Sequence, residues 1–352
     1  MSQNLSDFSP VQGFEFGGCL PYKNLNKVKN QATRFLKTIA MSLLVSIATV
    51  RLANAQGSTT RILPQPGYYN MQVGNLPVTV LSDGTNPLDM AQLLLNAKPG
   101  QLQRGFAENF LTTTVENSDN EFLIRTGGKL VLVDAGSGDL LGASFGQLTK
   151  SLQNAGVQPE QIDAILLTHL HPDHVGGLMR NGKMVFPNAT IYIAKAESNF
   201  WLTPEALKNA PAAYKPFFEY AQNSALPYAN AGKVKTFNPG DVLFPGITVL
   251  GSAGHTAGHT SYIIESNGDK LLILGDLIHA QAIQFADPGI AIGYDSDPKA
   301  AIITRRSVFD DAVKGKYLVA GSHLSFPGIG HIKATGNGYL WIPANYSTIV
   351  SK

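Results

Sequence analysis

Short apolar stretches separated by glycine-containing turns dominate the chain after Gln56, and this pattern predicts many strands. Residues 68–73 and 77–82 read as a hairpin around Gly74-Asn75, and residues 122–126 and 129–133 as a second hairpin around Gly127-Gly128. The nearly continuous apolar run at residues 162–167 is typical of a buried strand. Further strands are predicted at residues 191–194, 234–237, 247–250, 262–264, 271–274 and 317–320.

Helical patterns lie between these strands. Phe145, Leu148 and Leu152 have helical spacing, and Gly156 is placed to end that helix. Residues 197–225 are mostly helical in pattern, with breaks expected at Pro204, Pro211 and Pro216. Strands in both halves with helices grouped between them predict two sheets covered by helices, an α/β architecture in a single domain over residues 56–352.

The first fifty-five residues have the pattern of a secretory signal peptide. Arg34 and Lys37 precede an apolar run at residues 39–50, and Ala53-Asn54-Ala55 resembles a cleavage site. The run is too short to cross a hydrocarbon core about 30 Å thick, so no stable membrane span is expected. We therefore predict an exported protein, periplasmic or secreted, that is cleaved after Ala55; a buried amphipathic helix is the alternative.

Composition excludes several classes of protein. The 352 residues carry a formal net charge of +2 and only one cysteine, which excludes a disulfide framework and cysteine-based zinc sites. The weak charge argues against nucleic acid as a partner. Residues 1–55 hold six basic residues, two acidic residues and Cys19, so the expected mature chain is cysteine-free with a net charge of −2. The surplus of apolar residues is compatible with a homodimer.

All eight histidines lie between His169 and His331, and four potential metal ligands fall within six positions. This run, Thr168-His169-Leu170-His171-Pro172-Asp173-His174, directly follows the strand predicted at residues 162–167. Residues two apart diverge on a helix but project to one side of an extended chain, so His169 and His171 can converge. Pro172 then turns the chain, which lets Asp173 and His174 reach a second point nearby.

Three later segments add ligands of the same kind. His255 lies between Gly254 and Gly258, while Asp276 and His323 each follow a predicted strand. Together with the run they supply five histidines and two aspartates, enough for two divalent metal ions with coordination positions open to water. We expect two Zn²⁺ ions, although imidazole and carboxylate ligands also suit Fe, Mn or Co.

This order of ligands resembles the metallo-β-lactamase superfamily. The resemblance implies an αββα four-layer sandwich with the site at one edge of the two sheets. It implies that one metal is held by His169, His171 and His255, that the other is held by Asp173, His174 and His323, and that Asp276 bridges them. Asp134 matches a carboxylate that orients a ligand histidine, and a strand-end cap is the equal alternative.

Within the superfamily, the chain is similar to methyl parathion hydrolase and its lactonase and aryl-esterase relatives from about Gly67 to Ser347. The similar segments are residues 67–69, 81–85, 171–179 and 323–331. The resemblance implies that a hydroxide bridging the metals attacks a neutral lactone, aryl ester or phosphotriester. Asp173 and Asp276 are the expected catalytic carboxylates, with proton acceptance and a purely structural role both open for Asp276.

Aromatic residues are the candidates for the substrate pocket: Trp201, Phe217, Phe285 and Tyr294, with core packing as the alternative for each. In the phosphotriesterase relatives the positions of His279 and Tyr294 are leucines, and the loop before Phe217 is one residue longer. These departures favour lactones or aryl esters, with phosphotriester cleavage as a side activity. His259 and His331 are expected outside the ligand set, as residues that support the ligands or pack.

Three alternatives remain from the sequence. An organophosphorus hydrolase of the methyl parathion type is the first, and a β-lactamase or thioester hydrolase of the same fold is the second. The third is a metal-binding protein without catalysis, against which the complete set of ligand residues argues.

Overall fold

Two seven-stranded sheets form the centre of the computed structural model, which describes residues 65–212 and 214–348. The first sheet has the order β1-β2-β4-β5-β6-β9-β10, with bounds Tyr68–Val73, Leu76–Asp89, Thr114–Thr126, Lys129–Val133, Ala164–Leu166, Thr190–Ala194 and Val234–Phe237. The second has the order β11-β12-β13-β14-β16-β17-β18, with bounds Val242–Phe244, Ile247–Gly251, Thr260–Ser266, Asp269–Ile273, Leu318–Ala320, Ile329–Thr335 and Gly338–Pro343. The predicted αββα sandwich is thereby confirmed.

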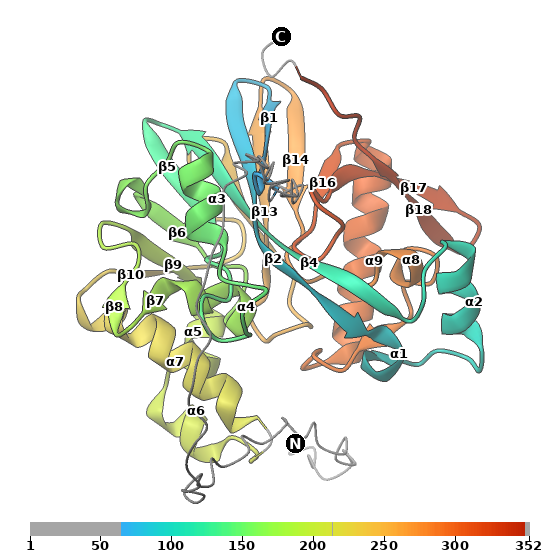
Figure 1. Ribbon diagram of the computed structural model, residues 1–352, viewed down its shortest axis with the longest axis horizontal. Helices are drawn as coiled ribbons and strands as arrows, with labels where there is room; N and C mark the ends of the chain where they lie inside the picture. The colour runs from blue at the N-terminus through green and yellow to red at the C-terminus, as the bar shows by residue number, and fades with distance from the viewer. Residues whose placement is uncertain (1–64, 213, 349–352) are drawn as a thin grey trace, which may run out of the picture. The chain divides into compact units, whose positions relative to one another are not determined.

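Helices cover the outer faces of both sheets (Figure 1). Beside the first sheet lie α3 to α7, with bounds Leu148–Asn154, Pro172–Val175, Lys195–Trp201, Pro204–Asn209 and Lys215–Asn230. The second sheet is covered by α9, Pro298–Gly315, near which lie α8, Gln281–Gln284, α2, Gln101–Glu108, and α1, Met90–Leu93. Two-stranded pairs join β3, Leu94–Leu95, to β15, Ala291–Ile292, and β7, Met179–Arg180, to β8, Lys183–Met184. Short 3-10 turns lie at Pro159–Gln161 and Gly176–Leu178.

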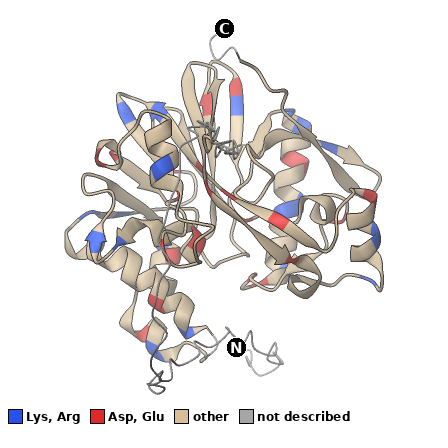
Figure 2. Ribbon diagram, in the orientation of Figure 1, with Lys and Arg blue, Asp and Glu red and all other residues tan. Residues whose placement is uncertain are grey.

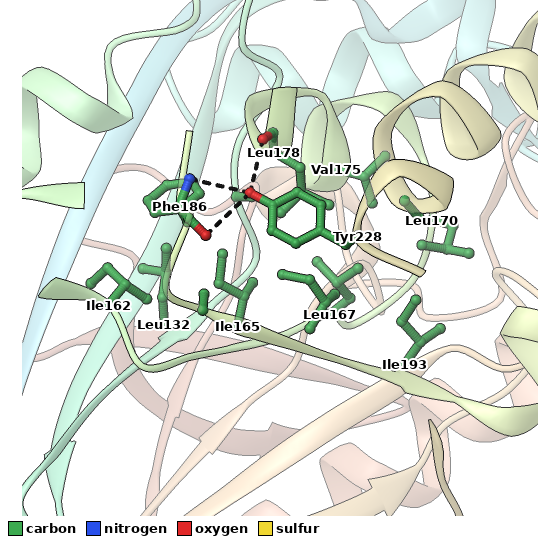
Figure 3. Packing of buried hydrophobic residues seen from close by; sticks show 14 of the residues in the cluster. Leu132, Ile162, Ile165, Leu167, Leu170, Val175, Leu178, Phe186, Ile193 and Tyr228 are labelled. Carbon is green, nitrogen blue, oxygen red and sulfur yellow. Dashed lines mark hydrogen bonds between the residues drawn. The ribbon is translucent and has the colours of Figure 1, made fainter. Parts of the chain in front are cut away.

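Alternating side chains divide the apolar residues into layers. Phe122, Val131 and Tyr262 belong to the core between the sheets, whereas Leu123 and Leu132 pack on the opposite face of the first sheet. Figure 3 shows that outer layer, where Ile165 and Leu167 face Val175, Leu178 and Tyr228. The Tyr228 hydroxyl accepts a hydrogen bond from the Phe186 amide at 3.1 Å and donates to the Leu178 carbonyl at 3.1 Å, so this buried phenol is satisfied.

The predicted hairpins form as expected, because their glycine turns match the register. Val73 pairs with Leu76 across Gly74-Asn75, and Thr126 pairs with Lys129 across Gly127-Gly128. The other predicted strands also form, with small shifts of their ends.

The helix predictions need three corrections. Phe145 lies before α3 rather than on it, because the Asp83 carboxylate accepts hydrogen bonds from the amides of Gly146 and Leu148 and holds the chain in a loop until Leu148. Pro216 lies in the first turn of α7, where its missing N–H costs nothing, so it does not break the helix. That helix also continues past residue 225 to Asn230.

Residues 1–55, on which the signal-peptide prediction rests, lie outside the described residues. Among the helices that are described, none has the length and apolar character needed to span a membrane. Basic and acidic residues are scattered over both sides of the ribbon in Figure 2.

Candidate metal centre

The ligand residues emerge where strands of both sheets end. His169 and His171 follow β6, Asp173 and His174 lie on the short helix α4, and His255 lies between β12 and β13. Asp276 and His323 follow β14 and β16, two parallel neighbours. Since β12 and β14 both pair antiparallel with β13, the ends of β12, β14 and β16 meet at one edge of the second sheet.

Two clusters of ligand atoms result. One contains His169, His171, His255 and Asp276, and the other contains Asp173, His174, Asp276 and His323, with the ligand atoms of each cluster within 4.8 Å of one another. Asp276 belongs to both. The structure therefore brings all seven predicted ligands together, in the same partition that the family resemblance implies.

Several buried polar atoms in these clusters have no hydrogen-bond partner. They include Nε2 of His169, Nε2 of His174 and Oδ1 of Asp276. Leaving such atoms unpaired is costly in a buried site, and each of them is a good ligand for a divalent cation. The residues present thus fit two divalent metal ions.

Electrostatics divide the ligand histidines into two groups. Although burial disfavours a charged imidazole, the Asp276 carboxylate raises the pKa of His174 well above its usual value and the pKa of His255 and of His323 to about 9, so a metal ion must displace protons from these three. Burial holds the pKa of His169 and His171 well below the usual range, so both are neutral, as metal binding requires. Burial alone would raise the pKa of Asp276, but the surrounding histidines, foremost His174 and His323, lower it well below its usual value. Asp276 is therefore an anion.

The two residues predicted to support the ligands lie against them. The Asp134 carboxylate accepts hydrogen bonds from Nδ1 of His174 at 2.8 Å and from the amide and hydroxyl of Thr168 at 2.7 and 2.8 Å. It thus fixes a histidine of one cluster and the start of the ligand run. His259 is buried, and its Nε2 accepts a hydrogen bond from the Asp276 amide at 3.0 Å.

Two supporting residues were not predicted. The Asp295 carboxylate accepts a hydrogen bond from Nδ1 of His255 at 2.9 Å. Nδ1 of His323 donates to the Ser118 carbonyl at 2.8 Å, and the side-chain amide nitrogen of Asn117 lies 3.2 Å from the same ring nitrogen. Aspartate and asparagine are common in loops and at strand ends, so nothing in their local sequence distinguished these two.

Four of the predicted pocket residues lie near the clusters. The rings of Trp201 and Phe217 are centred 5.7 and 5.8 Å from the ring of His171. His279 is buried, with Nε2 3.1 Å from Oδ2 of Asp276, and its ring stacks on His323 at 4.9 Å. Tyr294 lies beyond it, partly exposed, with its ring centred 6.2 Å from that of His279.

Phe285 follows the core-packing alternative, and the prediction for His331 is wrong. Phe285 is buried in the layer between the second sheet and α9, where it stacks on Phe309 and Trp341. His331 is exposed on β17, with Nδ1 3.2 Å from the Tyr317 carbonyl, and it neither supports a ligand nor packs in the core. The residue type alone therefore does not predict whether a phenylalanine or a histidine lies at the site, in the core or on the surface.

Comparison with known proteins agrees with this geometry. The family model described as Metallo-beta-lactamase superfamily matches residues 118–323. A solved hydrolase of the beta lactamase superfamily, AbOPH, has a TM-score of 0.77 and 36% identity, covering 81% of this chain and 100% of that one. AidC, described as a dizinc quorum-quenching lactonase in complex with the product N-hexanoyl-L-homoserine, has a TM-score of 0.74 and 31% identity, covering 80% of this chain and 99% of that one.

Curated relatives cover less of the chain. An N-acyl homoserine lactonase of Bacillus cereus is 31% identical over 155 residues, which are 44% of this chain and 53% of that protein. An N-acyl homoserine lactonase of a Bacillus species is 29% identical over 160 residues, or 45% of this chain and 55% of that protein. The chain therefore spans about half the length of the curated relatives it matches.

Proposed function

Because the chain belongs to the metallo-beta-lactamase superfamily, we propose that it is a metal-dependent hydrolase that opens the ring of lactones, with N-acyl homoserine lactones as the first candidates. The observation that carries the proposal is the position of Asp276, which joins two ligand clusters into one binuclear site. The lactonase relatives and the similarity to a dizinc lactonase support the lactone as substrate and Zn²⁺ as the metal.

The chemistry divides between the metals and the chain. Two divalent ions, when bound, would polarise an ester carbonyl and lower the pKa of water to near neutrality. Asp276 holds both clusters together, and its low pKa keeps it ionised for that role. Asp173 contributes a carboxylate to one cluster only, and 24% of its side chain is exposed, so it faces the side from which a substrate arrives.

The surroundings of the site suit an amphipathic acyl lactone. The partly exposed ring of Phe217 lies next to His171 and packs beside the buried Trp201, and this apolar surrounding suits an acyl chain. On the other side, His279 has a buried Nδ1 without a hydrogen-bond partner, and the Tyr294 ring lies next to it. These two residues offer polar contacts to the ring ester or the amide of the substrate.

Kinetics on three substrates test the proposal. The Zn²⁺-loaded protein should show a higher kcat/KM on N-hexanoyl-L-homoserine lactone or dihydrocoumarin than on methyl parathion, and metal analysis should give two ions per chain. Protein stripped with a chelator is the control and should be inactive until Zn²⁺ is restored. A higher kcat/KM on methyl parathion would instead assign phosphotriesters as the main substrates. Full activity after treatment with the chelator would refute the metal dependence.

We also propose that the protein is exported after removal of residues 1–55. The basic residues before an apolar run and the Ala-Asn-Ala sequence support this. Expression of the full chain in a bacterial host followed by N-terminal sequencing of the periplasmic fraction should find Gln56 as the first residue. Recovery of the intact chain from the cytoplasm alone would refute export.

A further inference from the structure

Two loops from different sheets carry the three histidines of the first cluster, which comprises His169, His171, His255 and Asp276. His169 and His171 lie on the loop after β6 of the first sheet, and His255 lies on the loop between β12 and β13 of the second. The distance between these loops decides whether three imidazoles can meet one ion. Something must therefore hold the loops together at a fixed spacing.

Glu197, in the first turn of α5, lies between the two loops. Its side chain is buried, and its carboxylate accepts four hydrogen bonds. Oε1 accepts from the Leu170 amide at 3.1 Å and from Nε1 of Trp201 at 2.6 Å. Oε2 accepts from the Thr256 hydroxyl at 2.9 Å and from the Gly258 amide at 2.7 Å.

These donors lie immediately beside the histidines. Leu170 separates His169 from His171, and Thr256 follows His255. The approach at Gly258 is so close that a Cβ there would lie 2.4 Å from the Glu197 amide nitrogen, which only glycine avoids. The fourth donor, Trp201, is the residue whose ring contacts His171.

We propose that Glu197 is a positioning residue that sets the affinity of the first cluster for its metal ion while leaving the second cluster unaffected; the proposal rests on the binuclear site of the proposed function. The second cluster is held by other residues, since the Asp134 carboxylate holds His174 and the Ser118 carbonyl holds His323. The same carboxylate also orients the Trp201 ring, so metal binding and the apolar side of the pocket depend on one residue.

The isosteric substitution Glu197→Gln tests this role. Four donors converge on the two carboxylate oxygens, but an amide offers one oxygen and one NH₂ group. Whichever way the amide turns, its NH₂ group faces at least one backbone or indole N–H that cannot reverse its polarity. One loop must move away, and the spacing of the histidines changes.

Stepwise metal affinities are the measurement. Competition between the apoprotein and a chromophoric chelator for Zn²⁺ gives two dissociation constants for the wild type. In Glu197→Gln one of the two sites should bind Zn²⁺ about 10- to 100-fold more weakly, the range for residues that orient metal ligands, while the other site keeps its affinity. Equal weakening at both sites, or no change at either, would overturn the proposal.

Two further variants separate positioning from a general loss of stability. Tyr228→Phe removes a buried hydroxyl whose hydrogen bonds go to Phe186 and Leu178 and to no metal-ligand residue, and it should lower stability without changing either dissociation constant. If Glu197→Gln does not fold, Thr256→Val removes a single donor to Oε2 and should weaken binding at the same site by a smaller factor. An effect of Tyr228→Phe equal to that of Thr256→Val would refute the assignment.

The outcome is distinguishable from failure of the proposed function. A wild type that binds two ions and shows a selective loss in Glu197→Gln, yet cleaves no lactone, supports the role of Glu197 and refutes the substrate. A wild type that cleaves lactones but loses both ions together in Glu197→Gln supports the function and overturns the role of Glu197.

Discussion

Arg305 provides the sharpest test of how the site is supported from the second sheet. Its side chain is fully buried on α9, and the guanidinium donates to the carbonyls of Leu277, Pro288 and Ile290, the last two at 3.0 and 2.9 Å. These carbonyls belong to the segment between Asp276 and Tyr294. Burial lowers the pKa of Arg305 only to about 10, so the group stays charged at neutral pH.

The substitution Arg305→Met keeps an unbranched side chain but removes all three donors. The Ile290 carbonyl retains its bond from Nε2 of Gln284 at 3.0 Å, so two carbonyls lose the donor that Arg305 provides. At about 1–3 kcal/mol for each buried group left unpaired, the loss is roughly 2–6 kcal/mol. Relief from burying a guanidinium offsets part of this, so we expect a net destabilisation of about 3 kcal/mol.

Urea denaturation followed by circular dichroism measures this loss, with Arg306→Met as the matched control. Arg306 is the next residue on α9 and is exposed, so its replacement should change the free energy of unfolding by less than about 0.5 kcal/mol. Arg305→Met should also raise KM, because the segment that it releases carries His279 and Tyr294. Equal stability of the two variants would refute the reasoning.

Two further predictions concern charge in the interior. Glu121 is buried with both carboxylate oxygens unpaired, and burial, with Asp119 and Asp83 nearby, raises its pKa well above the usual value. A carboxyl whose pKa is raised in the folded state lowers the stability of the protein as pH rises through that pKa, by about 1.4 kcal/mol for each unit by which the pKa is raised. Glu121→Gln should therefore stabilise the protein more at pH 9 than at pH 5. Equal shifts of Tm at both pH values would contradict this. Chelation should lower Tm by roughly 10 °C, because an ion bound at 1,000 times its Kd contributes about 4 kcal/mol, and a Tm unchanged by chelation and by added Zn²⁺ would exclude a metal from the folded state.

The sequence predicted the strands whose apolar pattern and turns are local, and it missed elements whose pattern the site disturbs. On β4, residues 117–121 are polar yet buried, so the strand was recognised only from residue 122. On α9 the buried face contains Arg305, whereas Ile303 is 68% exposed, and this reverses the expected helical periodicity. Binary patterning fails at both places because tertiary hydrogen bonds, rather than apolar contact, decide what is buried there.

The residues of the metal site also differ in how well the sequence predicts them. The ligands were predictable because four of them are close in sequence and the others follow recognisable strands. Among the residues that hold them, Asp134 and His259 were predicted, whereas Asp295, Glu197 and Ser118 were not. Each of these three acts over a long separation: 40 residues from Asp295 to His255, 61 from Glu197 to Gly258 and 205 from Ser118 to His323. Only the pairing of the strands brings these residues together.

These distant partners determine the chemical form of the ligands. Asp134, Asp295 and the Ser118 carbonyl are acceptors, so Nδ1 of His174, His255 and His323 must carry the proton in each contact. In neutral imidazoles, Nε2 then has a free lone pair, and in all three it lies 3.2 to 3.3 Å from a carboxylate oxygen of Asp276. Lone pairs directed at an anion repel it, so this arrangement is stable only with protons or cations between them. Without a metal, protons meet this need, because Asp276 raises the pKa of all three histidines against the effect of burial. Two divalent ions would take the place of these protons, so the residues outside the ligand run also favour a metal site.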